Sequence, residues 1–246
     1  MQHPLFLTDS VNVLLAAAAV AGAFLGLLSS LAALQLGQPF QPNSEPLIAG
    51  PVDEFSPNWF SRMHQHTGAA AVGALGFAAL ALVFGQSTQL VLAAIFTIAL
   101  LTLALIDARF YVLPDLLTLP LLWLGLLINT QSYFAAIANA VLGAAVGYLS
   151  LWTIYWLFKL LCNKEGLGYG DFKLTAAIGA WLGWQALPSV VLVAALTALC
   201  SAAVFVLAGR MKVEQPMPFG PFLALAGFLT VCVGQRLTQW MSGVLS

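Results

Sequence analysis

The chain has 246 residues, of which 61% are hydrophobic and only 7% are charged, and its formal net charge is −1. A soluble domain usually carries roughly 25% charged residues, so this composition is too apolar to cover the surface of a water-soluble fold. The chain also has no basic patch of the kind that binds nucleic acid. The composition therefore predicts an integral membrane protein, with the lipid bilayer as a partner and no nucleic acid.

Hydropathy along the chain predicts an all-α, polytopic membrane protein with about eight transmembrane helices, because a spanning helix needs about 20 mostly apolar residues. Residues 1–67 are expected to hold the first helix and a reduced cytoplasmic loop, and residues 68–246 a seven-helix transmembrane core. The predicted spans are 11–36, 68–85, 88–106, 116–131, 134–161, 173–184 (extending toward 187), 188–208 and 219–243.

The first of these spans is expected to stay in the protein. The first ten residues contain no Lys or Arg, and the apolar run that follows is too long for the hydrophobic region of a cleavable signal peptide. Further along, Gly143 and Gly147 suit close packing between helices in lipid, although small residues also occur simply as apolar filler.

The segment from about Gly37 to Thr67 is the long polar stretch of the chain and contains five prolines. It is expected to be a loop with at most a short amphipathic helix near Pro57 to His66. His64 and His66 raise the question of a metal site with a nearby carboxylate. However, residues two apart on a helix point to different faces, so no metal site is predicted.

Most Lys and Arg residues lie in alternate predicted loops. The odd-numbered loops hold five of them, whereas one lies near the opposite side. By the positive-inside rule the odd loops are cytoplasmic and both termini face outward. The residues in the odd loops are Arg62, Arg109, Lys164, Arg210 and Lys212, with Lys159 and Lys173 flanking these loops, and the exception is Arg236.

Two aspartates lie where predicted helices meet cytoplasmic loops. Asp107 is at the end of the third span and Asp171 is at the start of the sixth. A carboxylate at an apolar boundary is costly, and its presence there usually indicates a function. Because both residues lie on the same predicted side at similar depth, two helices could bring them together.

Paired carboxylates have a specific chemical use. Two such groups held a few ångströms apart cannot both ionise cheaply, so one keeps its proton. The ionised group can then take a proton from water while the protonated group hydrogen-bonds a scissile carbonyl. Which of Asp107 and Asp171 would be the base is left open, because such a pair titrates as a unit.

Three glycines, Gly166, Gly168 and Gly170, precede Asp171 at alternate positions. Glycine permits positive φ and close approach of another chain, so an extended substrate could pair with this backbone as an added strand. A second interpretation also fits the local residues. In it the segment is a flexible interhelical loop and Asp171 caps the following helix.

The segment Gly-Tyr-Gly-Asp-Phe-Lys-Leu at 168–174 resembles the signature of the type IV prepilin peptidases, which are GxGD intramembrane aspartyl proteases. Asp107 followed by Leu113–Leu122 is similar to the first aspartate segment of this family, and Pro218–Leu225 is similar to its last-span motif. The three blocks occur in the family's order and cover roughly residues 100–230.

The resemblance implies an intramembrane aspartic endopeptidase of the bacterial inner membrane, with Asp107 and Asp171 as the catalytic pair. Its substrate would be a type IV prepilin or pseudopilin of a pilus or a type II secretion system. Such a substrate has a short basic leader followed by a hydrophobic helix and is cut after a glycine on the cytoplasmic side.

Two further residues near the aspartates have alternative interpretations. Asp115 is a third candidate for catalysis, although its position after Pro114 also suits a turn or cap. Lys173 either biases Asp171 toward ionisation or anchors the helix by reaching the membrane interface.

The chain departs from the resembled family in one respect. Many members carry two CxxC pairs between the first two spans, in a region resembling a zinc site and linked to N-methylation with S-adenosylmethionine. This chain has no cysteine between Met1 and Leu161. We therefore expect no zinc, and we expect S-adenosylmethionine as a cofactor only if methyltransferase activity is retained.

Three interpretations of the function remain open at this point. The chain is a protease with little methyltransferase activity, a bifunctional enzyme, or a non-catalytic assembly factor or transporter.

Overall fold

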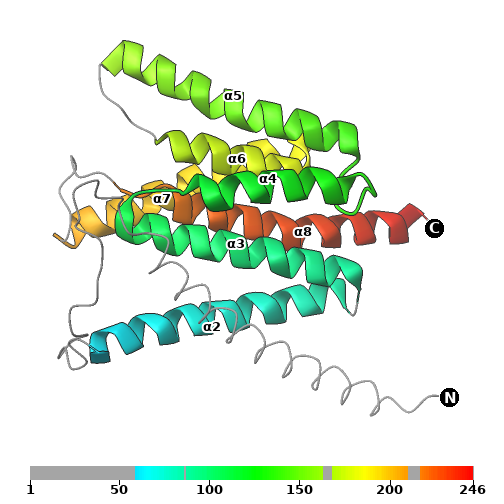
Figure 1. The fold of residues 1–246 in the computed structure, drawn as a ribbon, viewed down its shortest axis with the longest axis horizontal. Coiled ribbons are helices and arrows are strands. Elements are labelled where there is room, and N and C mark those ends of the chain that lie inside the picture. Colours follow the sequence, from blue (N-terminus) through cyan, green and yellow to red (C-terminus); the bar gives the residue numbers. More distant parts are fainter. Residues whose placement is uncertain (1–58, 86, 163–167, 210–216, 246) are drawn as a thin grey trace, which may run out of the picture.

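A computed structural model describes residues 59–85, 87–162, 168–209 and 217–245, with side chains described in 71–85, 87–161, 168–209 and 217–234. The described residues form helices that lie side by side, and they contain no strand, as the all-α prediction requires (Figure 1). The elements are α2 (Trp59–Phe84), α3 (Thr88–Phe110), α4 (Asp115–Asn129), α5 (Ile137–Cys162), α6 (Tyr169–Leu182), η1 (Trp184–Ala186), α7 (Leu187–Leu207) and α8 (Gly220–Leu245).

Three segments are long and apolar enough to cross a membrane, namely Thr88–Phe110, Ile137–Leu161 and Trp184–Leu207. Ala71–Phe84, Asp115–Asn129 and Gly220–Gly234 are shorter apolar helices. Each predicted span from residue 68 onward coincides with one described helix, whereas the predicted span 11–36 lies outside the described residues. The chain is thus an integral membrane protein by the length and composition of its helices.

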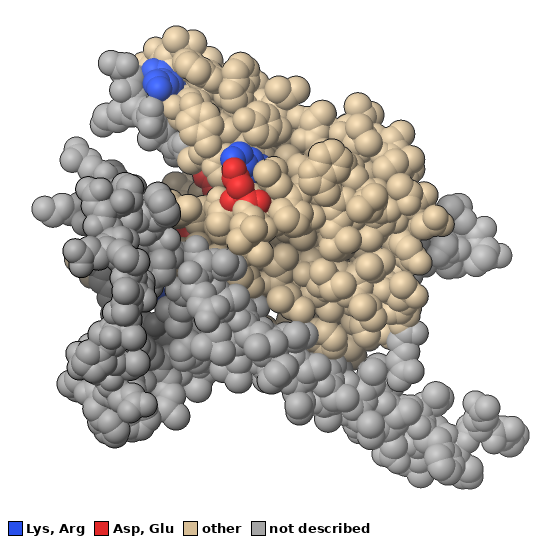
Figure 2. Space-filling model, in the orientation of Figure 1, with Lys and Arg blue, Asp and Glu red and all other residues tan. Residues whose placement is uncertain are grey.

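Successive helices run in opposite directions (Figure 1). As a result, α3, α5 and α7 end at the same end of the bundle at which α4, α6 and α8 begin. We call this end the site end. Charged side chains cover little of the visible described surface and lie toward the site end, while the rest of that surface is uncharged (Figure 2).

The start of α2 differs from the sequence prediction. The second span was predicted from residue 68, after a loop with a short separate helix, but α2 begins at Trp59 and continues without a break. Residues 59–67 contain neither proline nor glycine, so the backbone has no local reason to stop between the two parts. The short helix expected near Pro57 to His66 is therefore the first part of α2.

Close packing of α5 on α6 depends on glycine. A Cβ atom at Gly143 would collide with the carbonyl oxygen of Gly179, and one at Gly147 would lie 2.7 Å from the carbonyl oxygen of Thr175. The two backbones can approach this closely only because neither glycine has a side chain. The prediction that Gly143 and Gly147 serve helix packing is confirmed, and α6 lies buried between α5 and α4.

Polar side chains tie the far end of α6 to α4. Nδ2 of the buried Asn129 donates to the carbonyl oxygens of Ala180 and Trp181, at 2.9 and 2.8 Å, and its Oδ1 accepts from two backbone amides that follow α4. Nε1 of Trp181 donates to the carbonyl oxygen of Leu121 at 2.8 Å. Buried polar groups are costly unless paired, so these satisfied bonds fix the position of α6 and of the residues at its start.

Candidate active site

Asp107 lies in the last turn of α3 and is 6% exposed. Its Oδ2 accepts a hydrogen bond of 2.8 Å from the backbone N–H of Gly220, the first residue of α8. A carboxylate near the C-terminal end of its own helix is disfavoured by the helix dipole, whereas the N-terminus of another helix favours it. The start of α8 therefore stabilises a charge that α3 alone would not.

Gly220 is a site residue to which the sequence analysis gave no role. A Cβ atom at this position would lie 2.7 Å from Oδ2 and 3.0 Å from Cγ of Asp107, so a larger residue would displace the carboxylate. The block 218–225 was noted only for its resemblance to a family motif. The sequence feature that could have indicated the start of a helix at Gly220 is the Gly-Pro pair before an apolar run, which is typical of a helix N-terminus.

Asp171 is the third residue of α6 and is also 6% exposed. Its Oδ2 accepts a hydrogen bond of 3.0 Å from the backbone N–H of Gly168, the residue that precedes the helix. This is the reciprocal half of a capping box. Asp171 therefore does close the start of α6, as the alternative interpretation expected, although from inside the first turn rather than as the N-cap residue.

The structure brings the two aspartates together. Asp107 and Asp171 are 64 residues apart in sequence, but both lie buried at the site end, one in the last turn of α3 and the other in the first turn of α6. Each carboxylate uses one oxygen to accept a backbone N–H, from α8 in one case and from the start of α6 in the other. Two buried carboxylates, held by backbone amides from two of the sequence blocks, thus form an acidic pair at the same end of the bundle.

Two of the three glycines before Asp171, Gly168 and Gly170, do not use the positive φ that glycine permits. Gly168 has φ −84° and ψ 148°, an extended conformation open to any residue, and Gly170 lies within α6 without positive φ. Gly170 is nevertheless required for close approach, because a Cβ atom there would lie 2.7 Å from Cβ of Leu113. The segment between α3 and α4, rather than a second chain, fills that space. Gly166 lies outside the described residues.

Lys173 contacts Asp115 rather than Asp171. Its Nζ lies 2.6 Å from Oδ1 and 2.8 Å from Oδ2 of Asp115, which is in the first turn of α4. The pair connects α6 to α4 at the site end, one turn beyond the contact between Gly170 and Leu113. Of the two interpretations of Lys173, a direct action on Asp171 is supported by no contact among the described residues. Asp115 occupies the helix-start position that its alternative interpretation expected.

Among the described side chains, no group of three or more His, Cys, Asp or Glu residues could hold a metal ion. The side chains at which a zinc site was considered, His64 and His66, lie outside the described side chains. The absence of a metal therefore stays a prediction.

A model of the type IV leader peptidase family matches residues 94–203, which include both aspartates of the pair. Residues 94–203 belong to this family. The assignment confirms the resemblance that was predicted from the sequence blocks around Asp107 and Asp171.

Several curated relatives carry the name prepilin leader peptidase/N-methyltransferase. The one from Burkholderia pseudomallei (strain 1026b) is 54% identical over 173 residues, which are 70% of this chain and 56% of the relative. The one from Aeromonas hydrophila is 50% identical over 148 residues, 60% of this chain and 51% of the relative. The one from Pseudomonas aeruginosa is 46% identical over 156 residues, which are 63% of this chain and 54% of the relative. The chain thus spans about half the length of these relatives, and no solved structure matches it.

Proposed function

We propose that this chain is an intramembrane aspartic endopeptidase that removes the short basic leader of type IV prepilins or pseudopilins, cutting after a glycine at the cytoplasmic membrane face. One observation carries the proposal. Asp107 and Asp171, from helices separated in sequence, are both buried at the site end, and each carboxylate is held there by a backbone N–H. The type IV leader peptidase family and the names of the relatives support the choice of substrate.

The pair can divide the chemistry between two identical groups. The ionised carboxylate takes a proton from a water molecule, whose oxygen attacks the scissile carbonyl carbon, while the protonated carboxyl hydrogen-bonds the carbonyl oxygen. The carbon–nitrogen bond then breaks, and the pair returns a proton to the leaving amine. The backbone amides of Gly220 and Gly168 hold one oxygen of each carboxylate in place during these steps.

The proposed topology has eight spans in the bacterial inner membrane, the site end at the cytoplasmic face and both termini outward. The alternation of Lys and Arg between predicted loops supports it. Cysteines introduced near Arg109, Glu165 and Lys212 should then be labelled from the cytoplasmic side, and cysteines near Asp9 and Ser246 from the other. Labelling of positions 109 and 165 from opposite sides would contradict this topology.

A cleavage assay tests the proposed reaction. The full chain in lipid vesicles should shorten a membrane-inserted prepilin by its leader, and mass spectrometry should locate the cut after a glycine. The Asp107→Asn variant should insert normally and lose activity by several orders of magnitude, since one carboxamide removes half of the acid–base pair. No cleavage by the unmodified chain would contradict the proposal, as would near-normal cleavage by the variant.

A bifunctional enzyme is the second candidate, because the relatives are named as N-methyltransferases as well as peptidases. The absence of cysteines from residues 1–161 weighs against a family-type zinc region, so methylation would need another structural support. Transfer of a labelled methyl group from S-adenosylmethionine to the new N-terminus of a cut prepilin would establish it. A third candidate, an assembly factor or transporter without catalysis, predicts no cleavage in the assay above.

A further inference from the structure

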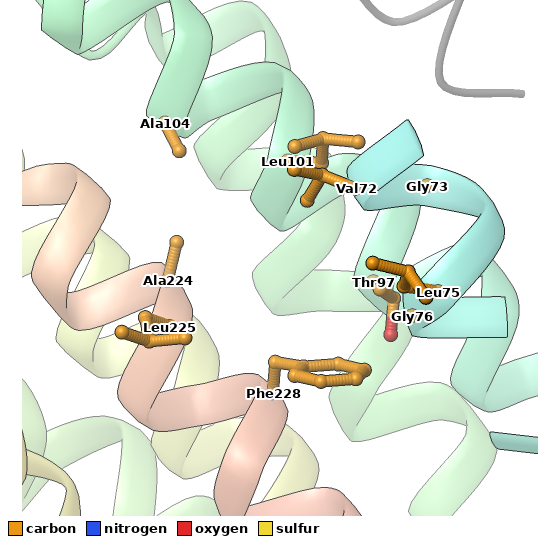
Figure 3. A pocket seen from close by; sticks show the side chains of 10 residues that line it. All are labelled: Val72, Gly73, Leu75, Gly76, Thr97, Leu101, Ala104, Ala224, Leu225 and Phe228. Carbon is orange, nitrogen blue, oxygen red and sulfur yellow. The ribbon is translucent and has the colours of Figure 1, made fainter. Parts of the chain in front are cut away.

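An apolar groove of about 330 Å³ lies between α2, α3 and α8. Side chains and glycines from the three helices face a common space (Figure 3), including Gly73, Gly76, Leu101, Ala104, Ala224 and Phe228. The groove is open to the outside of the bundle, where Val72 and Leu75 are 57% and 73% exposed. Thr97 is the polar residue in its wall, and its hydroxyl is already bonded to the carbonyl oxygen of Ala93.

One end of the groove lies about one helical turn from residues of the acidic site. Ala104 precedes Asp107 by three residues on α3, and Ala224 follows Gly220 by four residues on α8. Each is therefore about one helical turn, or about 5 Å, from a residue that forms the site. Ala104 and Ala224 face each other at this end, while the ring of Phe228 extends toward α2 at the other (Figure 3).

On the basis of the proposed function, we infer that this groove binds the apolar helix that follows the scissile bond of the substrate. A helix that leaves the acidic pair needs an apolar path beginning beside Asp107, and this groove supplies one. Its α3 wall, from Thr97 to Ala104, spans eight residues and a rise of about 10 Å, which is close to two turns of a bound helix.

The chemistry of the walls favours a helix. Apolar surfaces gain little by associating in lipid, so helices there associate mainly through close packing at small residues. Gly73 and Gly76 on α2, Ala104 on α3 and Ala224 on α8 leave room for a helix backbone from three sides. A lipid acyl chain and residues 11–36 of this chain are the competing occupants.

Filling the groove tests the inference. A Cβ atom at Gly76 would lie 3.7 Å from the Phe228 ring, an ordinary contact, so the position accepts a Cβ, and the rest of the side chain in Gly76→Leu adds volume to the groove. This variant should cut a full-length membrane-inserted prepilin at least about tenfold more slowly, mainly through a higher KM, because ground-state binding of the helix is lost. Ala195→Leu, on the exposed face of α7, is the matched control and should leave cleavage unchanged.

A cross-linking measurement identifies the occupant without requiring cleavage. In one variant of the full chain a benzophenone amino acid replaces Leu225, which lines the groove. In the control variant it replaces Leu192, on the exposed surface of α7. Each variant is placed in vesicles together with a prepilin. The groove position should capture the apolar helix of the prepilin at least about fivefold more than the α7 position does. Capture of lipid or of residues 11–36 instead, or equal capture from both positions, would overturn the inference.

The two proposals fail in distinguishable ways. If the unmodified chain does not cut the prepilin, the proposed function is contradicted. If the unmodified chain cuts it while Gly76→Leu cuts equally fast, the peptidase stands and the groove inference is overturned. Slower cleavage by Gly76→Leu together with prepilin captured at Leu225 supports the groove.

Discussion

Glycine has opposite effects on the two sides of this bundle. Where α5 meets α6, the space beside Gly143 and Gly147 is filled by the backbone of the neighbouring helix. Where α2 meets α3 and α8, the space beside Gly76 is part of an open apolar groove. The comparison indicates that the α5–α6 contact fixes the position of α6, and hence of Asp171. The groove between α2, α3 and α8, in contrast, leaves room for a ligand beside Asp107.

The same substitution on the two sides should give the largest contrast in stability. Gly143→Ala places a methyl group against the Gly179 carbonyl and should lower the stability by about 3 kcal/mol, because the helices must separate. Gly76→Ala makes an ordinary contact and should change the stability by less than about 1 kcal/mol. Unfolding of both variants in the same detergent measures the difference. Equal stability would show that the two sides are packed alike.

The groove side also contains a glycine that touches the acidic pair. Gly220→Ala puts a methyl group against the Asp107 carboxylate and should reduce prepilin cleavage by about 100-fold, since displacement of a reacting group by an ångström has that order of effect. Gly234→Ala, on the same helix, where the added Cβ meets no atom of the described residues within 4 Å, is the control and should be near normal. Similar activity of the two variants would exclude a positioning role for Gly220.

The ion pair between Lys173 and Asp115 should have the smallest effect. Both side chains are partly exposed, 31% and 55%, so the pair is expected to contribute less than about 1 kcal/mol. Lys173→Met and Asp115→Asn should each retain most of the cleavage activity, and exchanging the two charges should restore stability in a double-mutant cycle. Loss of activity as severe as that of Asp107→Asn would return Asp115 to the catalytic candidates.

Much of the fold could be predicted from the sequence because hydropathy is a local property. Each predicted span from residue 68 onward coincides with a described helix, and the distribution of Lys and Arg between the predicted loops predicts Asp107 and Asp171 on the same side. The start of α2 at Trp59 was missed because polar residues between 59 and 67 mark a loop in hydropathy but do not stop a helix.

The contacts of the site could not be predicted in the same way. The bond from Gly220 to Asp107 joins residues 113 apart in the chain, and the partner of Lys173 is 58 residues away. Such contacts depend on how helices pack, for which neither hydropathy nor charge gives a signal. The glycines before Asp171 were expected to permit positive φ and the close approach of another chain, but at Gly170 the close neighbour is Leu113 of the same chain and φ is not positive.

The central claim is that Asp107 and Asp171 act as one catalytic unit. The most direct test compares Asp107→Asn, Asp171→Asn and the double variant in one prepilin cleavage assay in vesicles. Each single variant should lose several orders of magnitude of activity, and the double variant should lose little more, because either change alone removes the acid–base pair. Losses that multiply in the double variant, or near-normal cleavage by either single variant, would contradict the account.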